Sequence, residues 1–308
     1  MAKSRTKARV IYNPASGGDG FDPEEVRRKL DGYELEWIET GSAEEAENAA
    51  WEWGEGLLVV AGGDGTVTQV VNGLGRAGFP GSVTLALLPM GTGNDLASTL
   101  AVPEDGEGAI ETIRENSVRE LDIIRVRHEA DENRFLINVA TGGVGARTTD
   151  EADDETKRRW GKMAYLMSAL EVARDFEVQE MRLTLDGEER RVRAINVAVG
   201  NGRYAGGGWP AAPRANPEDG LIDLVVIEDV GLPEMLALAP GALAGSDYLD
   251  RSGVYFDRAK EIRVETEPSE FEFTVDGEVI GRSPVEFIIM PRALKVVVGA
   301  EYVPEPEV

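Results

Sequence analysis

Short apolar runs alternate with stretches of helical periodicity through the first third of the chain. The apolar runs predict strands at residues 9–12, 33–38, 57–61 and 84–88, and the periodic stretches predict helices at residues 23–30, 42–53, 66–74 and 94–100. Ser42, with Glu45 three residues later, has the form of a capping box at the start of the second helix. Strands that alternate with helices in this way build parallel sheets, so an α/β domain is predicted for this part.

The pattern changes near Leu121. Strands with alternating apolar and polar positions then follow one another across turn signals, at residues 121–126, 133–140, 178–185, 190–199, 221–227, 261–265, 271–275, 285–289 and 294–298. One amphipathic helix is predicted at residues 159–175, after a charged, solvated stretch at 150–159, and its apolar stripe indicates packing. The predicted fold class is α/β + β: an N-terminal α/β domain with a parallel sheet at residues 1–122, then a mainly antiparallel β-sandwich domain at residues 123–291.

Length and charge fit a folded chain of two domains. The 308 residues are many for one mixed domain, and 42% of them are hydrophobic. The 57 acidic residues exceed the 32 basic ones and give a formal net charge of −25, and only 7 of the 32 basic residues are Lys. Carboxylates spread over almost every segment, which resembles proteins from salt-accumulating halophiles. An ordinary acidic surface is the alternative interpretation.

Several classes of site and partner are excluded by composition. The absence of cysteine excludes disulfides, thiolate metal sites and a cysteine nucleophile. The single histidine, His128, lies in a polar stretch where we expect it to be solvated, so the expected general base is a carboxylate. A field of this negative sign repels a phosphate backbone, so no nucleic-acid partner is expected.

No part of the sequence predicts a membrane span. No run approaches 18 apolar residues, and the basic segment MAKSRTKARV leads into strand-like residues without the apolar core of a signal peptide. A cytoplasmic location is therefore expected, with peripheral contact to a membrane as an option. The oligomeric state is left open, and a homodimer is one option.

A glycine-rich loop follows the most apolar of the predicted strands. Gly62-Gly63-Asp64-Gly65-Thr66 lies between that strand and a helix, where parallel sheets place their ligands. Glycines there permit positive φ and let an anion approach the backbone amides, and the helix N-terminus favours phosphate. Asp64 would repel a phosphate unless a divalent cation lies between them. A purely structural turn is the alternative, which the aspartate makes less attractive.

Two further loops end strands of the same predicted sheet. Pro89-Met90-Gly91-Thr92-Gly93-Asn94-Asp95 has the same strand-to-helix placement one unit later, and Asn94 or Asp95 could there be only a helix cap. Asn13-Pro14-Ala15-Ser16-Gly17 ends the first strand. Neighbouring parallel strands with such ends form one crevice, so the three loops together predict a binding site.

These motifs resemble the diacylglycerol kinase catalytic-domain family, which includes bacterial-type lipid kinases and the sphingosine and ceramide kinases. The resemblance is carried by YNPASGG, AGGDGTVTQVVNGL and LLPMGTGNDLA, and it continues through GKMAYLMSAL, NVAVGNGRYAGGGWPAAPRANPEDGLIDLVVI and TVDGEVIGRSPVEFIIMPRALKVVV. It covers most of the chain in family order, whereas NAD kinases and phosphofructokinases share only the GGDG-type loop. It implies that the first domain binds ATP, that the C-terminal segment 292–308 completes that domain, and that the β domain binds the lipid.

The resemblance implies particular ATP-binding residues. They are Asn13, Ser16, Thr40, Gly62, Gly63, Asp64, Gly65, Thr66, Gln69, Thr92, Gly93, Asn94 and Asp95. One departure stands out, because the family has Asn-Glu where this chain has Thr68-Gln69. Either that glutamate is dispensable, or this member has altered nucleotide chemistry.

The segment NPEDGLID is similar to the family's structural magnesium loop. The resemblance implies that the Asp219 carboxylate and the main-chain oxygens of Asn216 and Leu221 hold Mg²⁺. One carboxylate with turn carbonyls suits a hard cation. A polar turn before a strand is the alternative.

Asp-Gly-Glu occurs twice in the second domain. Both copies have the sequence of a hairpin turn, and Asp186-Gly187-Glu188 needs no further explanation. The second copy, Asp276-Gly277-Glu278, falls where the family has its catalytic acidic pair. The resemblance therefore implies that Glu278 is the general base with Asp276 beside it, and Asp64 is the other catalytic candidate.

The sequence as a whole predicts an ATP- and Mg²⁺-dependent lipid kinase. Its substrate would be a lipid hydroxyl at a membrane surface, in a diacylglycerol-like or isoprenoid lipid alcohol. Two alternatives are carried forward: an NAD or sugar-type kinase of the same superfold, and a non-catalytic protein that senses nucleotide or lipid, which Gln69 keeps open.

Overall fold

The computed structural model describes residues 6–17, 22–128, 131–143, 178–230, 248–267 and 271–306. The chain divides into two compact units, and each is described by itself. Unit 1 comprises residues 1–123 and 291–303, and unit 2 comprises residues 124–290 and 304–308. The predicted helix at 159–175 and the charged stretch before it lie outside the described residues. No helix in the described ranges is long and apolar enough to cross a bilayer.

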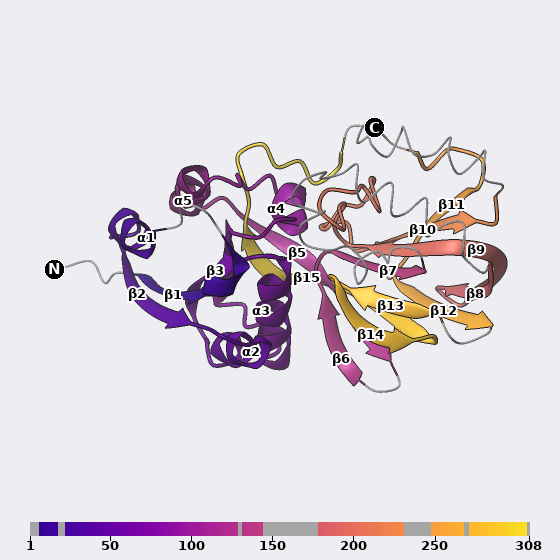
Figure 1. The fold of residues 1–308 in the computed structure, drawn as a ribbon, viewed down its shortest axis with the longest axis horizontal. Helices are drawn as coiled ribbons and strands as arrows, with labels where there is room; N and C mark the ends of the chain where they lie inside the picture. The colour runs from indigo at the N-terminus through magenta and orange to yellow at the C-terminus, as the bar shows by residue number, and fades with distance from the viewer. Residues whose placement is uncertain are drawn as a thin grey trace. The chain divides into compact units, whose positions relative to one another are not determined.

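Unit 1 is an alternation of strands and helices (Figure 1). In chain order they are β1 (Thr6–Tyr12), α1 (Pro23–Lys29), β2 (Tyr33–Glu39), α2 (Ala43–Trp51), β3 (Gly56–Gly62), α3 (Asp64–Arg76), β4 (Val83–Pro89), α4 (Asp95–Thr99) and α5 (Gly106–Glu115). Ser42 caps α2 by accepting a hydrogen bond from Glu45 N at 3.3 Å, as its sequence predicted.

The sheet of unit 1 is parallel, and its strand order is β2-β1-β3-β4 followed by the end of β15 (Val285–Val297). The inner strand β3 is buried along nearly its whole length, which explains its continuous apolar sequence. Figure 1 shows α1 and α5 on one side of the sheet and α2 and α3 on the other. Helices on both faces thus bury the sheet and leave the ends of its strands for ligands.

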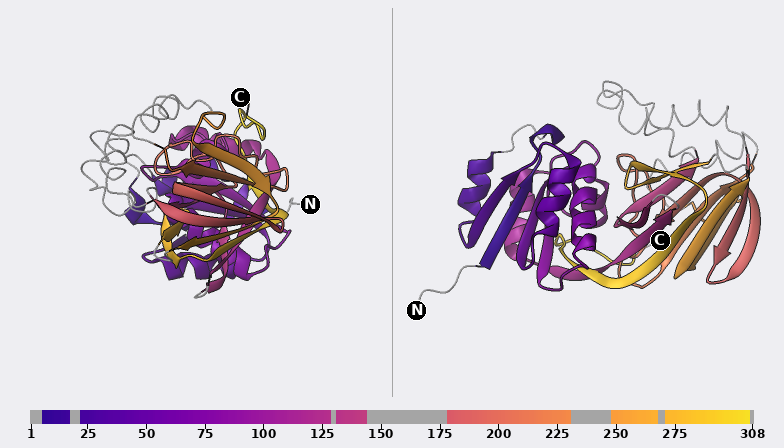
Figure 2. Two further views of the ribbon diagram at one scale, coloured as in Figure 1. Left: turned by 90° about the vertical axis from the view of Figure 1, so that its right-hand side faces the viewer. Right: turned by 90° about the horizontal axis from the view of Figure 1, so that it is seen from below.

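Unit 2 is mainly antiparallel, as the alternating pattern predicted. Its strands are the end of β5 (Val118–His128), β6 (Asp131–Leu136), β7 (Val139–Gly143), β8 (Gln179–Leu185), β9 (Glu188–Gly200), β10 (Ile222–Glu228), β11 (Val254–Ala259), β12 (Glu261–Glu267), β13 (Glu272–Val275), β14 (Glu278–Arg282) and the start of β15. The main sheet has the order β14-β13-β7-β9-β8-β12-β15, and the right-hand view of Figure 2 shows β8, β9 and β12 side by side. Inward side chains such as Leu183, Leu224, Phe273 and Phe287 form its core.

Several elements differ from the sequence predictions, and two strands, β11 and β14, were not predicted at all. Helix α5 was not predicted, because Gly106 and Gly108 in its first turn lower the helix propensity of this segment. The stretch predicted as one strand at 133–140 is divided between β6 and β7. The strands predicted at 285–289 and 294–298 are one strand, β15, which continues past Pro291.

Candidate active site

The carboxyl ends of β1 and β3 lie next to each other in the sheet of unit 1. After β1 the chain turns to α1 on one face of the sheet, and after β3 it turns to α3 on the opposite face (Figure 1). Because the two connections leave in opposite directions, these neighbouring strand ends form a topological switch point, which is where open α/β sheets bind ligands.

The first glycine-rich loop and the loop after β1 contact each other here. The Asn13 backbone N–H donates to the Ala61 carbonyl at 3.0 Å, and Asn13 Nδ2 donates to Thr66 Oγ1 at 3.2 Å. Ser16 Oγ lies 3.4 Å from the same Thr66 hydroxyl. The fold therefore brings together Asn13, Ser16 and Thr66, three residues that the sequence assigned to nucleotide.

Thr40 directly follows β2, next to the end of β1. Its backbone N–H and its hydroxyl both donate to the Tyr12 carbonyl, at 2.8 and 3.3 Å. The side chain is buried, so its hydroxyl links the ends of β1 and β2.

The glycines of the first loop allow its backbone to approach the second loop closely, and the expectation that they adopt positive φ is wrong. Neither Gly62, Gly63 nor Gly65 has a positive φ. A Cβ on Gly63 would lie 3.1 Å from Gly91 Cα, and a Cβ on Gly91 would lie 2.7 Å from Gly63 Cα. The two glycine-rich loops therefore pass backbone against backbone, which only residues without a side chain permit.

Asp64 joins the two loops through its carboxylate. Its oxygens accept hydrogen bonds from the backbone N–H groups of Asp95 at 3.1 Å and Leu96 at 3.3 Å. Burial raises the pKa of the Asp64 carboxyl above its ordinary value, and these backbone hydrogen bonds offset part of that effect. Asp64 therefore caps α4 from another part of the chain.

This arrangement corrects the sequence interpretation of Asn94. Asn94 stands at the N-cap of α4 with φ 51°, but its side chain makes no cap hydrogen bond. Its amide instead closes its own loop, accepting from Gly91 N at 3.0 Å and donating to the Gly91 carbonyl at 2.8 Å. Asp95 begins the helix and is itself buried.

The remaining predicted nucleotide residues lie on α3 and on the second loop. Gln69 is buried in α3, whereas Thr92 is exposed on the loop. No side chain caps the first turn of α3, where Gly63 is the N-cap residue. The backbone N–H groups of that turn are therefore suited to an anion.

In unit 2, the loop predicted to hold a metal is tied to itself and to β11. Asp219 Oδ1 accepts from Leu221 N at 2.9 Å, and Asp219 Oδ2 lies 3.4 Å from Arg258 Nη1. The Asn216 carbonyl accepts from Asp219 N at 3.4 Å. Burial raises the pKa of the Asp219 carboxyl, and Arg258 lowers it in part.

Asp223 follows this loop, and the sequence analysis predicted no role for it. Its side chain is 1% exposed, and neither carboxylate oxygen has a hydrogen-bond partner among the described residues. Burial raises its pKa to about 7, with Asp219 adding to the effect. The Asp219 carboxylate, the turn carbonyls and the nearby buried carboxylate of Asp223 are oxygen donors of the kind that suits a hard divalent cation, so the residues present fit the implied Mg²⁺. The described residues hold no group of three or more His, Cys, Asp or Glu side chains that could bind a metal, so such a site depends on carbonyl oxygens.

The turn Asp276-Gly277-Glu278 connects β13 to β14. Val275 pairs with Glu278 across the hairpin, and both turn residues have positive φ, at 46° and 86°. The Asp276 carboxylate accepts hydrogen bonds from the backbone N–H groups of Ile137, Asn138 and Val139, each at 3.1 Å. Asp276 therefore anchors the turn to the segment between β6 and β7, while Glu278 forms an ion pair with Arg134 of β6.

The other Asp-Gly-Glu turn has almost the same backbone. Asp186 and Gly187 have φ of 48° and 90°, and Asp186 likewise accepts from the backbone N–H groups of Lys260 and Glu261. The Glu188 side chain is exposed and makes no hydrogen bond or ion pair with the described residues, although its backbone pairs with Leu185. The two turns thus differ in what surrounds the glutamate.

His128, which we expected to be solvated, is half-buried and makes a hydrogen bond. The residue ends β5, and its Nε2 lies 2.5 Å from the carbonyl oxygen of Arg282, to which it donates. The ring also lies directly against Gly281, where a Cβ would come within 2.6 Å of His128 Cε1.

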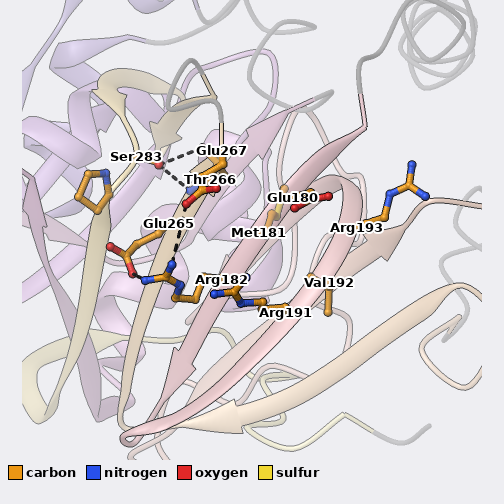
Figure 3. A pocket seen from close by; sticks show the side chains of 11 residues that line it. Glu180, Met181, Arg182, Arg191, Val192, Arg193, Glu265, Thr266, Glu267 and Ser283 are labelled. Carbon is orange, nitrogen blue, oxygen red and sulfur yellow. Dashed lines mark hydrogen bonds and ion pairs between the residues drawn. The ribbon is translucent and has the colours of Figure 1, made fainter.

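A separate hollow of about 320 Å³ lies on β8, β9 and β12 (Figure 3). Arginines and glutamates of these strands line it, including Arg182, Arg191 and Glu265. None of the site residues predicted from the sequence lines it.

An α/β unit with glycine-rich loops at its switch point, followed by a β-sandwich unit, defines a two-unit kinase fold. Sequence models agree: the diacylglycerol kinase catalytic domain matches residues 7–126, and the YegS C-terminal NAD kinase beta sandwich-like domain matches residues 138–298. The chain is 32% identical to a diacylglycerol kinase of Bacillus subtilis (strain 168) over 304 residues, covering 96% of this chain and 97% of that protein. It therefore belongs to the diacylglycerol kinase catalytic-domain family and is a lipid kinase.

Further relatives have the same extent. A diacylglycerol kinase of Staphylococcus aureus (strain MRSA252) is 31% identical over 300 residues, which cover 95% of this chain and 92% of that protein. The crystal structure of a diacylglycerol kinase from Bacillus anthracis str. Sterne superimposes with a TM-score of 0.77 at 26% identity, covering 98% of this chain and all of that one. Matches through both units favour the lipid-kinase interpretation over an NAD or sugar-type kinase.

Proposed function

We propose that this protein transfers the γ-phosphoryl group of ATP to the hydroxyl of a lipid alcohol, with Mg²⁺ as the metal. The acceptor is a diacylglycerol-like or isoprenoid lipid presented at a membrane surface. The observation that carries the proposal is the meeting of the loops after β1, β3 and β4 at the strand ends of unit 1, through Asn13, Thr66, Gly63, Gly91 and Asp64.

In this proposal, residues 1–122 with 292–308 form the ATP-binding domain. The phosphates lie against the uncapped first turn of α3, where N–H groups and the helix dipole attract negative charge. Phosphoryl transfer asks mainly for positioning and charge neutralisation, and two loops locked together by Asp64 supply a rigid platform. The family relation supports ATP as the donor.

Residues 123–291 form the lipid-binding domain in the same proposal, and its metal loop holds Mg²⁺. The carboxylate of Asp219 and the carbonyls of Asn216 and Leu221 would be ligands, and the buried Asp223 carboxylate adds negative charge nearby. Bound there, the cation would neutralise these carboxylates and fix the loop.

Glu278 is the proposed general base. The chain has no cysteine, and its single histidine donates to a backbone carbonyl, so the hydroxyl proton passes to a carboxylate or to the substrate itself, and a carboxylate is the candidate on the protein. The Asp276 oxygens receive three backbone N–H groups, which suits Asp276 to anchoring, and those of Asp64 cap α4. Glu278 is the carboxylate of the three that is one-third exposed and projects from an anchored turn.

The test compares two glutamates in matching turns. Glu278→Gln keeps the shape of the side chain and removes its basicity, so turnover should fall about 10²- to 10⁴-fold while ATP binding persists. Glu188→Gln should leave turnover at the parent value. Both variants are assayed with labelled ATP and a total lipid extract at molar salt, and mass spectrometry identifies the phosphorylated lipid. If the two substitutions lowered turnover equally and only slightly, Glu278 would have no role beyond the hairpin, and Asp64 would become the candidate base.

A further inference from the structure

The hairpin of β5 and β6 contacts β14, the strand that begins with Glu278, at two points. Near one end of β14, Arg134 of β6 forms the ion pair with Glu278. Near the other end, His128 of β5 donates to the Arg282 carbonyl and lies against Gly281. All of these residues belong to unit 2, so the contacts lie within one compact body.

These contacts matter because β14 lies at the edge of its sheet. In the strand order it stands last, with β13 as its neighbour. An edge strand lacks a backbone partner on one side and is held less firmly than an inner strand. Side-chain contacts from the β5–β6 hairpin therefore help to fix the direction in which Glu278 projects.

Arginine is the cation best suited to orient a carboxylate. Its planar guanidinium presents fixed N–H groups, whereas a lysine ammonium is a point charge on a flexible stem. A carboxylate has two oxygens with about four lone-pair sites, so an ion pair to Glu278 Oε2 is compatible with proton acceptance from a hydroxyl. The side chains of Arg134 and Glu278 are only 24% and 32% exposed, which limits the competition from water.

We propose that Arg134 is a positioning residue, which orients the Glu278 carboxylate for proton abstraction from the lipid hydroxyl. This inference rests on the proposed function, because it assumes that Glu278 is the base. The alternative is an ion pair that contributes only to stability, and partly exposed pairs contribute about 1 kcal/mol or less. The two roles predict different kinetics.

The experiment measures kcat, KM for ATP and thermal unfolding of the full chain. Arg134→Gln should lower kcat about 10- to 100-fold, since a misplaced catalytic group costs rates of this order, and should leave KM for ATP within about twofold. Arg134→Lys keeps the charge without the planar fork, so its kcat should fall between those of the parent and Arg134→Gln. Combined with Glu278→Gln, Arg134→Gln should cause no further loss, because both substitutions act through one carboxylate.

The matched control is Arg182→Gln. Arg182 also belongs to unit 2 and forms ion pairs, with Glu265 at 3.7 Å and Glu267 at 3.9 Å, on β8 beside the hollow shown in Figure 3. The control should keep the parent kcat, which separates the loss of an arginine ion pair in general from the loss of this one.

Other outcomes would overturn either the role of Arg134 or the role of Glu278. The inference about Arg134 is wrong if Glu278→Gln lowers kcat while Arg134→Gln keeps the parent kcat. It is also wrong if the loss of kcat in the double variant equals the product of the two single losses. In both cases Glu278 remains the proposed base. If Glu278→Gln turns over like the parent, the base is wrong and the inference falls with it. Should Arg134→Gln not fold, Arg134→Lys decides alone, because a parent-like kcat in that variant would overturn a role for the guanidinium.

Discussion

Asp276 and Asp186 show how neighbours set the role of identical residues. Each aspartate begins a two-residue turn with positive φ, and each accepts backbone N–H groups from a neighbouring segment. The glutamates two positions later differ, because Glu278 has Arg134 beside it and Glu188 is exposed. At the scale of single residues, the neighbouring side chains therefore distinguish Glu278, the candidate base, from Glu188 in the matching turn.

Asp223 carries a testable cost to stability. Its folded pKa of about 7 lies above the unfolded value of 3.8, because burial disfavours the charged form. The folded protein thus binds this proton more tightly, so the carboxyl costs no stability below pH 4. The cost grows as the pH rises to about 7 and reaches up to about 4 kcal/mol, since one pKa unit corresponds to about 1.4 kcal/mol.

Asp223→Asn should therefore stabilise the protein at pH 8 in the presence of a chelator, and the gain should shrink toward pH 4. Denaturant unfolding at several pH values measures it. Asp31→Asn, at an exposed position, is the control and should leave the stability close to that of the parent. Added Mg²⁺ should reduce the gain, because the cation neutralises the parent carboxylate. A variant less stable than the parent at pH 8 under chelation would contradict the buried, unpartnered state of Asp223.

At the scale of elements, the predicted ligand site of unit 1 depends on loops that contact each other. The backbones of the two glycine-rich loops approach at Gly63 and Gly91, and the Asp64 carboxylate joins α3 to α4. A short helix such as α4, with five residues, gains its stability from such contacts more than from its own propensity.

Gly63→Val should abolish the rise in melting temperature that ATP with Mg²⁺ gives the parent, because the side chain would force the two loops apart. Gly81→Ala is the control, since a Cβ there has no neighbour within 4 Å and the residue lies outside the glycine-rich loops, and its melting temperature should still rise with ATP. Differential scanning fluorimetry at millimolar ATP measures both. A parent protein that shows no rise would count against the proposed ATP site.

At the scale of the whole molecule, a net charge of −25 is the dominant property. Like charges repel one another in a compact chain, and the screening length falls from about 10 Å at 0.1 M salt to about 3 Å at 1 M. Unfolding midpoints should therefore rise with KCl up to molar concentrations. Equal midpoints in dilute buffer and molar KCl would remove the halophile interpretation and leave the kinase proposal unchanged.

The sequence by itself determined the two kinds of fold and the positions of the loops. Continuous apolar runs such as residues 57–61 specify inner parallel strands, alternating runs specify the antiparallel unit, and Asp-Gly pairs specify hairpins. These features depend on residues close in the chain, so they can be read without the fold. Helix α5 was missed because its glycines weaken that local signal.

Only the tertiary structure decided which side chains meet. The Asp64 carboxylate caps a helix that begins 31 residues later, and His128 donates to a carbonyl 154 residues away. The ion pair of Arg134 with Glu278 and the buried, unpartnered state of Asp223 likewise arise when distant strands come together. Hydrogen bonding and desolvation depend on neighbours in space, and a linear pattern does not record those neighbours.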